Sequence, residues 1–247
     1  MGYNSIKKTI MKEIKFTYEG QTLCYEIDET TKTAKVVQSR DNKISGDVII
    51  PKEVTYEGTS YSVTEIDSVA FEGCKELTSI EIPESVTIIG DYAFVKCEGL
   101  RSIEIPSSVT FMGFSVFEKC KNLKSVELPN SITMIGMETF SGCRSLEFVE
   151  IPESVTTIGG FAFEDCNDLV RVDIPASVTP IDGKAFCRCH YIEEIYSKSN
   201  VPPTAEEDSF DEVPNGSMVI YVPKGSKDSY KKATGWKKFL NIEEYNF

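Results

Sequence analysis

The chain has 247 residues and an acidic composition: 39 Asp and Glu residues against 26 Lys and Arg residues give a formal net charge of −13. Duplex nucleic acid and anionic lipid both need a basic protein surface, so the charge argues against either as a partner. No run of about 18 apolar residues is present, so no membrane insertion is expected. Residues 1–14 lack the apolar region of a signal peptide, which leaves open a cytoplasmic chain or one whose leader has been removed.

Three short strands are predicted near the N-terminus. β-Branched and aromatic residues concentrate at 15–18, 22–27 and 33–37, with turn residues between them. Together they predict a β-meander that caps the structure over residues 1–46. The segment Asp47–Pro51 then predicts the first strand of a repeat array, and residues 56–61 predict a hairpin that protrudes from the first repeat.

Six phenylalanines and six cysteines recur with a constant step of 23 residues. A fixed period of this length predicts a solenoid, here over residues 47–197, in which equivalent residues stack. Because free cysteine packs as a small hydrophobe, we expect both series to form a buried structural ladder of reduced, unligated side chains. The members of the ladder are Phe71, Phe94, Phe117, Phe140, Phe163, Phe186, Cys74, Cys97, Cys120, Cys143, Cys166 and Cys189.

Each repeat is predicted to contain a strand, a bend, a second short strand and one helical turn. Alternation at Ile80 and Ile82 predicts a strand with two inward side chains, and Pro83 ends it because proline cannot donate to a continuing ladder. Ile89 lies in the second strand. The apolar residues of 93–97 then follow at the spacing of a single turn of α- or 3₁₀-helix.

The pattern weakens after Ile195, which indicates a degenerate last repeat and a C-terminal cap over residues 198–247. Residues 219–223 predict a last strand. Residues 226–234 predict a short helix, with Ser226 as its N-cap and Gly235 as its C-terminal stop. The apolar residues that would cover the end of the core are Trp236, Phe239 and Ile242.

The repeated motifs Leu-x-x-Ile-x-Ile-Pro, Ser-Val-Thr-x-Ile-Gly and Ala-Phe-x-x-Cys resemble the BspA-like class of bacterial leucine-rich repeats, over roughly four fifths of the chain. The resemblance implies an α/β leucine-rich-repeat solenoid, a right-handed β-α superhelix with an N-terminal β cap and a C-terminal helical cap. The chain departs from the general leucine-rich repeat because it lacks the ladder of asparagines. A series of serines lies near that position instead: Ser85, Ser108, Ser131, Ser154 and Ser177. The resemblance also implies a non-catalytic protein of a host-associated bacterium, secreted or displayed on the cell surface, that binds protein or matrix components.

Two columns of equivalent residues are candidate binding surfaces. The strand position between the inward residues predicts an acidic strip, which could serve solubility alone or bind a basic partner, a divalent cation or a glycan: Glu81, Glu104, Glu127, Glu150 and Asp173. The positions flanking the second strand predict an exposed lateral apolar patch, which could contact a protein partner or a second copy of the chain: Ile88, Phe111, Phe114, Met134 and Met137.

No catalytic or cofactor motif is found, and no cofactor is expected. His190 is the single histidine, and phosphate-binding loops and zinc-protease motifs are missing. The run Cys187-Arg188-Cys189-His190 has too few convergent ligands for a metal, and its period predicts an exposed, oxidisable Cys187. We therefore expect a non-catalytic, adhesin-like binding module for a host matrix or surface protein. The alternatives are an intracellular or periplasmic scaffold that self-associates, for example as a homodimer, and a cation- or glycan-binding surface.

Overall fold

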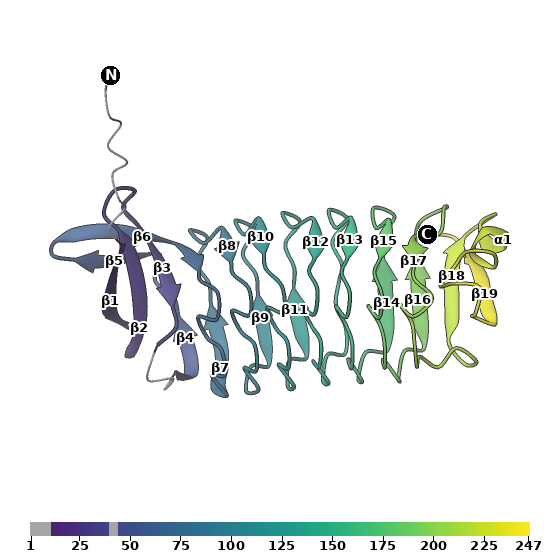
Figure 1. Cartoon of the computed structure of the whole chain (residues 1–247), viewed down its shortest axis with the longest axis horizontal. Coiled ribbons are helices and arrows are strands. Elements are labelled where there is room, and N and C mark those ends of the chain that lie inside the picture. Colours follow the sequence, from purple (N-terminus) through teal and green to yellow (C-terminus); the bar gives the residue numbers. More distant parts are fainter. Residues whose placement is uncertain (1–10, 40–43) are drawn as a thin grey trace, which may run out of the picture.

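The computed structural model describes residues 11–39 and 44–247. These residues form an elongated β-solenoid of about eight turns, whose rungs are stacked along one axis with the two capping regions at opposite ends (Figure 1). Apolar side chains from every rung point inward and form one continuous core. This is the core expected of a chain in which each repeat can bury its apolar face only against its neighbours.

The N-terminal cap contains the three predicted strands, and the first repeat carries the predicted hairpin. Antiparallel pairing joins β1 (Met11–Tyr18), β2 (Gln21–Asp28) and β3 (Thr33–Val37), and the hairpin consists of β5 (Glu53–Tyr56) and β6 (Thr59–Ile66). β3 and β6 pair in parallel, which attaches the meander to the first rung. Residues 1–10 and 40–43 of the expected cap lie outside the described residues, and the boundaries at residues 46 and 197 remain predictions.

The turns of the solenoid place strands on two sides (Figure 1). One side, the longer-strand face, is formed by β4 (Ser45–Ile49), β7 (Glu76–Glu81), β9 (Ser102–Glu104), β11 (Ser125–Glu127), β14 (Arg171–Ile174), β16 (Glu194–Ser197), β18 (Val219–Pro223) and β19 (Asn241–Tyr245). The other, the short-strand face, is formed by β8 (Ile88–Ile89), β10 (Phe111–Met112), β12 (Met134–Ile135), β13 (Thr157–Ile158), β15 (Pro180–Ile181) and β17 (Thr204–Ala205). Neighbouring strands on each side run parallel.

The phenylalanine series stacks into a column inside the solenoid. From Phe71 to Phe186 and on to Phe210, successive ring centroids are 5.1–5.6 Å apart and the rings are nearly parallel. The periodic cysteines lie beside this column and are buried and reduced. The thiol of Cys120 donates to the carbonyl of Phe94, with Sγ 3.1 Å from the oxygen, and the cysteines of later rungs repeat this bond.

Serine hydroxyl groups join neighbouring rungs at the bend, except that of Ser154, which has no hydrogen-bond partner among the described residues. Ser108 donates to the carbonyl of Val86, and Ser177 donates to the carbonyl of Val155, both at 2.6 Å. A short side chain that bonds the backbone in this way satisfies a carbonyl that the bend would otherwise leave unpaired.

The predicted helical turns are wrong, and with them the expected β-α superhelix. The segment from Tyr92 to Cys97 consists of successive tight turns, in which Tyr92 and Lys96 adopt φ of 58° and 59°. The amides of Tyr92, Phe94 and Lys96 do not bond within their own segment. They donate at 2.8–2.9 Å to carbonyl groups of the next rung, those of Phe114, Val116 and Glu118. Hydrogen bonding between rungs therefore replaces the i to i−4 bonds that a helix needs.

The C-terminal cap is mainly β structure, so the expected helical cap is also wrong. Its helix α1 spans only Lys227–Tyr230, and the Ser226 side chain makes no N-cap hydrogen bond but donates instead to the carbonyl of Pro223. β19 adds a further parallel strand beside β18. Buried aromatic side chains cover the last rung: Tyr230, Trp236 and Phe239.

Thiol labelling of the native protein is expected to leave all eight cysteines unmodified until the chain unfolds. Each is buried, and burial raises the pKa of Cys74 to about 11 and also raises the pKa of Cys187, so little reactive thiolate is present near neutral pH. Labelling with an aromatic disulfide, with the unfolded protein as the control, checks this. Rapid modification of Cys120 or Cys143 in the folded protein would show that the register of the rungs is wrong.

Candidate functional site

The lateral apolar patch lies on the short-strand face of the middle rungs. Phe111 and Phe114 are 50% and 49% exposed, and Met137 is 50% exposed. Ile88 and Met134 are each 36% exposed, and β8 and β10 pair so that Ile88 lies beside Phe111. The structure thus brings the five residues expected in this patch to neighbouring positions on the surface.

Tyr92 adds a sixth apolar side chain beside the patch that sequence reasoning missed. It is exposed and lies in the turn that follows β8. Its amide bonds the carbonyl of Phe114 at 2.9 Å. The period alone could not reveal its direction, because the equivalent Ser115 of the next rung is buried. Tyr92 and Ser115 both have positive φ, so the conformation of the turn does not by itself decide which of them is exposed.

Contacts with the neighbouring rungs hold Phe114 in place. The backbone amide of Phe114 donates to the side-chain carboxylate of Asp91 at 2.8 Å. The ring of Phe114 lies so close to Gly136 that a side chain at this glycine would meet it, since an added Cβ would be 3.3 Å from the ring. The ring therefore rests against a glycine of the next rung. In the next two rungs the patch ends, because smaller or less hydrophobic residues stand in its two columns: Thr157, Pro180, Gly160 and Gly183.

The acidic strip lies on the longer-strand face. Glu81, Glu104, Glu127 and Glu150 are exposed, whereas Asp173 is half-buried. Glu104 and Glu127 are paired positions of β9 and β11, and Glu150 forms an isolated bridge with Asp173. The structure therefore places the strip's members in one column along the solenoid.

Basic residues beside the strip neutralise it only at one end. Arg171 binds both carboxylate oxygens of Asp173, at 2.7 and 2.9 Å. Lys124, which the sequence places beside the strip, lies instead 3.2 Å from Glu147. Across residues 11–39 and 44–247, no basic side chain lies within ion-pair distance of Glu127 or Glu150.

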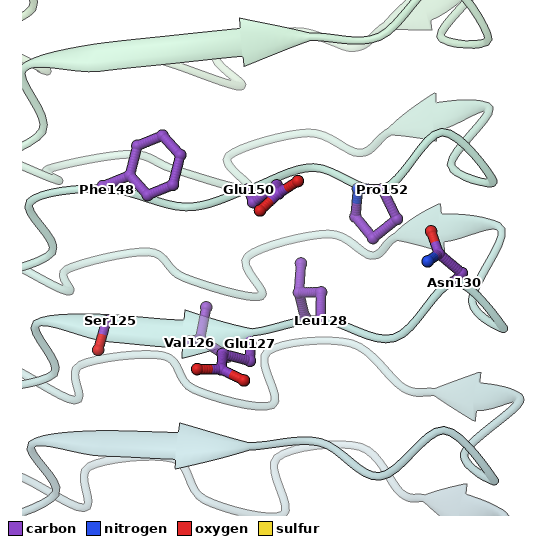
Figure 2. Close-up of a pocket in the computed structure, with 8 residues that line it drawn as sticks. All are labelled: Ser125, Val126, Glu127, Leu128, Asn130, Phe148, Glu150 and Pro152. Atoms are coloured by element: carbon purple, nitrogen blue, oxygen red, sulfur yellow. The ribbon is translucent and has the colours of Figure 1, made fainter.

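Shallow hollows follow one another along the strip. The one shown in Figure 2, with a volume of about 420 Å³, lies between β11 and the rung of Glu150. Two others, of about 400 and 530 Å³, lie over the preceding rungs. Figure 2 shows Phe148 and Glu150 on one rung and Glu127 on the neighbouring rung, and the ring of Phe148 is 44% exposed. Each hollow contains two or more carboxylates, so the strip is a surface with defined depressions.

An aromatic cluster, formed by Tyr196, Tyr221, Tyr245 and Phe247, continues the strip at its C-terminal end. The rings of Tyr196 and Tyr221 are stacked with centroids 4.5 Å apart, and Tyr245 and Phe247 pack edge-on against this pair. The guanidinium of Arg171 lies 4.1 Å from the centre of the Tyr196 ring. Tyr196 follows Asp173 by one period of the repeat and so shares its column, whereas the period does not place Tyr245 beside it.

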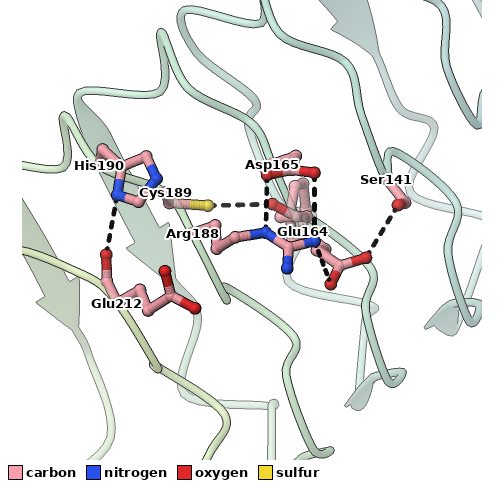
Figure 3. Close-up of polar contacts among 8 residues, drawn as sticks. Ser141, Glu164, Asp165, Arg188, Cys189, His190 and Glu212 are labelled. Atoms are coloured by element: carbon pink, nitrogen blue, oxygen red, sulfur yellow. Dashed lines mark hydrogen bonds and ion pairs between the residues drawn. The ribbon is translucent and has the colours of Figure 1, made fainter.

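The segment from Cys187 to His190 lies in the turns of the solenoid, and Figure 3 shows the side chains of Arg188, Cys189 and His190 there. Cys187 is 4% exposed, so the expected exposed thiol is wrong. Arg188 forms ion pairs with Glu164 and Asp165, and its hydrogen bond to Asp165 raises the pKa of the guanidinium. The ring of His190 lies 3.1 Å from the carbonyl of Glu212. Within the described part of the chain, no group of three or more His, Cys, Asp and Glu residues is placed to hold a metal.

No helix in the described ranges is long and apolar enough to cross a bilayer.

A search of curated proteins found no match. Among solved structures, the chain is similar to the T. pallidum leucine-rich repeat protein TpLRR, with 26% identity, a TM-score of 0.65 and coverage of 90% of this chain and 95% of that one. A leucine-rich repeat protein of Eubacterium ventriosum shares the fold, with 24% identity, a TM-score of 0.66 and coverage of 85% of this chain and 51% of that one.

The family comparison agrees with the repeat motifs. The model of the BspA type leucine-rich repeat region matches in six copies, over residues 64–193 and 112–222. These ranges together cover more than half of the chain and include every rung that carries the apolar patch and the acidic strip. The chain belongs to the BspA-type leucine-rich repeat family.

Proposed function

We propose that this chain is a non-catalytic protein-binding module that contacts its partner through the lateral apolar patch. Repeat proteins of this kind bind through surfaces that extend over several rungs. The observation that supports the proposal most directly is the exposure of Phe111, Phe114 and Met137 at positions where other rungs carry Thr157, Asp91 or Gly160. The fold does not need large apolar side chains at these positions, so their presence here supports a contact.

The size of the patch suits a protein partner. A half-exposed aromatic side chain presents roughly 100 Å² to solvent, so the six residues together present on the order of 500 Å². Contiguous patches of a few hundred Å² usually have a partner, and methionine adapts to irregular surfaces. Two copies that met through this patch alone would bury about 1,000 Å² in total, at the low end for a specific interface. The area does not distinguish the two kinds of partner; we favour a host matrix or surface protein, and self-association is the second candidate.

Changing Phe111 to Ser and Phe114 to Asp is expected to abolish partner binding while leaving the free energy of unfolding within about 1 kcal/mol, as for surface substitutions. Retention of labelled protein on immobilised extracellular matrix measures binding, and sedimentation velocity measures self-association. A matched control removes two other exposed apolar side chains, Tyr191 and Val201, by the same pair of changes.

The outcomes of this experiment separate three cases. Loss of retention alone supports a host partner, whereas loss of association alone supports the scaffold alternative. A double variant that unfolds would place Phe111 and Phe114 in the core and contradict the patch. A folded variant that keeps both interactions would show that the patch is not a contact surface.

We further propose secretion or display on the cell surface, which an adhesin-like role requires. The family assignment supports this location because BspA-like proteins are often surface-associated. The genomic reading frame upstream of Met1 provides the test: a leader there supports export, and a stop codon without a leader favours the scaffold alternative.

A further inference from the structure

The hollow between β11 and the rung of Glu150 has the parts of a receptor for a cationic side chain (Figure 2). Glu127 and Glu150 supply two carboxylates, and Phe148 supplies an aromatic ring. Leu128, Asn130 and Pro152 complete the lining with apolar and amide groups. A guanidinium binds carboxylate oxygens through its N–H groups and stacks on aromatic faces, so this combination suits arginine in particular.

The chain itself shows the same recognition close by on the longer-strand face. Arg171 donates from Nε and one terminal nitrogen to the two oxygens of Asp173, and its guanidinium lies 4.1 Å from the centre of the Tyr196 ring. Asp173 is the acidic-strip residue of the rung after Glu150, with which it forms a bridge. An arginine held by a carboxylate and a ring is thus already present on this surface, one rung from the hollow.

The hollow differs from the Arg171 site in that it lacks an internal cation. No Lys or Arg side chain among the described residues forms an ion pair with Glu127 or Glu150, and Phe148 replaces the serine that the three preceding rungs carry in its column: Ser79, Ser102 and Ser125. Strand pairing on the longer-strand face stops at β11, as it also does between β7 and β9. The ring and the carboxylates of this hollow are therefore not occupied by a cation of the described part of the chain.

We propose that this hollow binds an arginine side chain of an extended basic segment of a protein partner. The net charge of −13 complements such a segment, and the two neighbouring hollows, which contain Glu81, Glu84 and Glu104, extend the acidic surface along the solenoid axis. An organic cation is favoured over a metal, since no three acidic groups among the described residues are close enough together to coordinate one. The site lies on a different face from the lateral apolar patch and is independent of it.

The test uses a fluorescent decapeptide of alternating Arg and Ser, titrated with the full chain, and a citrulline–Ser peptide of the same length as its neutral isostere. We expect the arginine peptide to bind and the citrulline peptide not to bind. Phe148→Ser should weaken binding roughly 2- to 5-fold, since it removes an exposed cation–π contact. The pair Glu127→Gln and Glu150→Gln should weaken binding roughly 5- to 10-fold, since it removes two exposed charges. Both changes are expected to leave the circular dichroism spectrum unchanged, because serine occurs in this column and glutamine keeps the shape of glutamate.

Two controls make the result specific to the hollow. Glu29→Gln removes one exposed charge from the N-terminal cap and should leave binding unchanged, and so should the Phe111→Ser, Phe114→Asp double variant. The proposal is overturned if neither peptide binds, if the citrulline peptide binds as tightly as the arginine peptide, or if the variants in the hollow bind like the parent chain. It is also overturned if Glu29→Gln weakens binding as much as the Glu127→Gln and Glu150→Gln pair, because the peptide would then respond only to net charge.

Discussion

Replacing Phe117 with alanine is expected to lower the free energy of unfolding by about 3–5 kcal/mol. Its side chain is fully buried, and its ring lies between those of Phe94 and Phe140, with centroids 5.5 and 5.6 Å away. The alanine would leave a ring-sized cavity in the middle of the column. Because each rung contacts only its neighbours, the rungs on either side cannot collapse into this space without breaking their own hydrogen bonds.

Chemical denaturation followed by circular dichroism measures this loss, and Phe111→Ala is the matched control. Phe111 is the same residue type on the adjacent short-strand face, but it is half-exposed. Its truncation should change the free energy of unfolding by less than about 1 kcal/mol. Equal losses for the two variants would contradict the assignment of one phenylalanine to the core and the other to the surface. Hydrogen exchange should show reduced protection mainly in the rungs on either side of Phe117.

The repeat period was sufficient to predict which side chains share a column. A solenoid places equivalent residues one above another, so the stacking of Phe94 on Phe117 and the alignment of Glu104 with Glu127 follow directly from a step of 23 residues. The N-terminal strands were predictable for a different reason, because local alternation and turn residues mark them without reference to the repeat.

The backbone of the turns could not be predicted in the same way. The spacing of Ala93, Phe94 and Cys97 fits one helical turn, but it also fits two successive tight turns. The choice depends on amides that bond the next rung, such as that of Phe94 to Val116, and these partners are distant in sequence. Non-glycine residues such as Tyr92 and Lys96 occupy the positions of positive φ, so the sequence contained little sign of the turn type.

The same backbone explains the two errors of exposure in the candidate sites. Cys187 occupies the same repeat position as Val95, and both side chains are buried. The apolar Val95 was the one indication in the sequence that a side chain at this position can face inward. Tyr92 was missed because its column also contains the buried Ser115. The aromatic cluster at the C-terminal end depends on β19 pairing with β18 in parallel, a register outside the period that no local pattern indicates.

Replacing Trp236 with alanine is expected to cost about 3–5 kcal/mol and to loosen the C-terminal rungs before the rest of the solenoid. Trp236 is fully buried, its ring centroid lies 5.1 Å from those of Phe210 and Tyr230, and its indole N–H donates to the carbonyl of Pro203 at 2.8 Å. Phe210 is the last ring of the phenylalanine column, so the indole covers the end of the core. Without this cover, water reaches the last rung, which has no further rung to bury it.

Hydrogen exchange of the Trp236→Ala variant tests the location of the effect, and Trp236→Phe separates packing from hydrogen bonding. The phenylalanine keeps a ring against Phe210 but leaves the buried carbonyl of Pro203 without its donor, which costs about 1–3 kcal/mol. We therefore expect a graded series, with the alanine variant least stable and exchange fastest in β16 and β18. Because Trp236 is the single tryptophan of the chain, its fluorescence in the parent protein reports on the cap alone, and circular dichroism reports on the whole solenoid. If the two signals change together and Trp236→Ala leaves the protection of β18 intact, the indole does not seal the core.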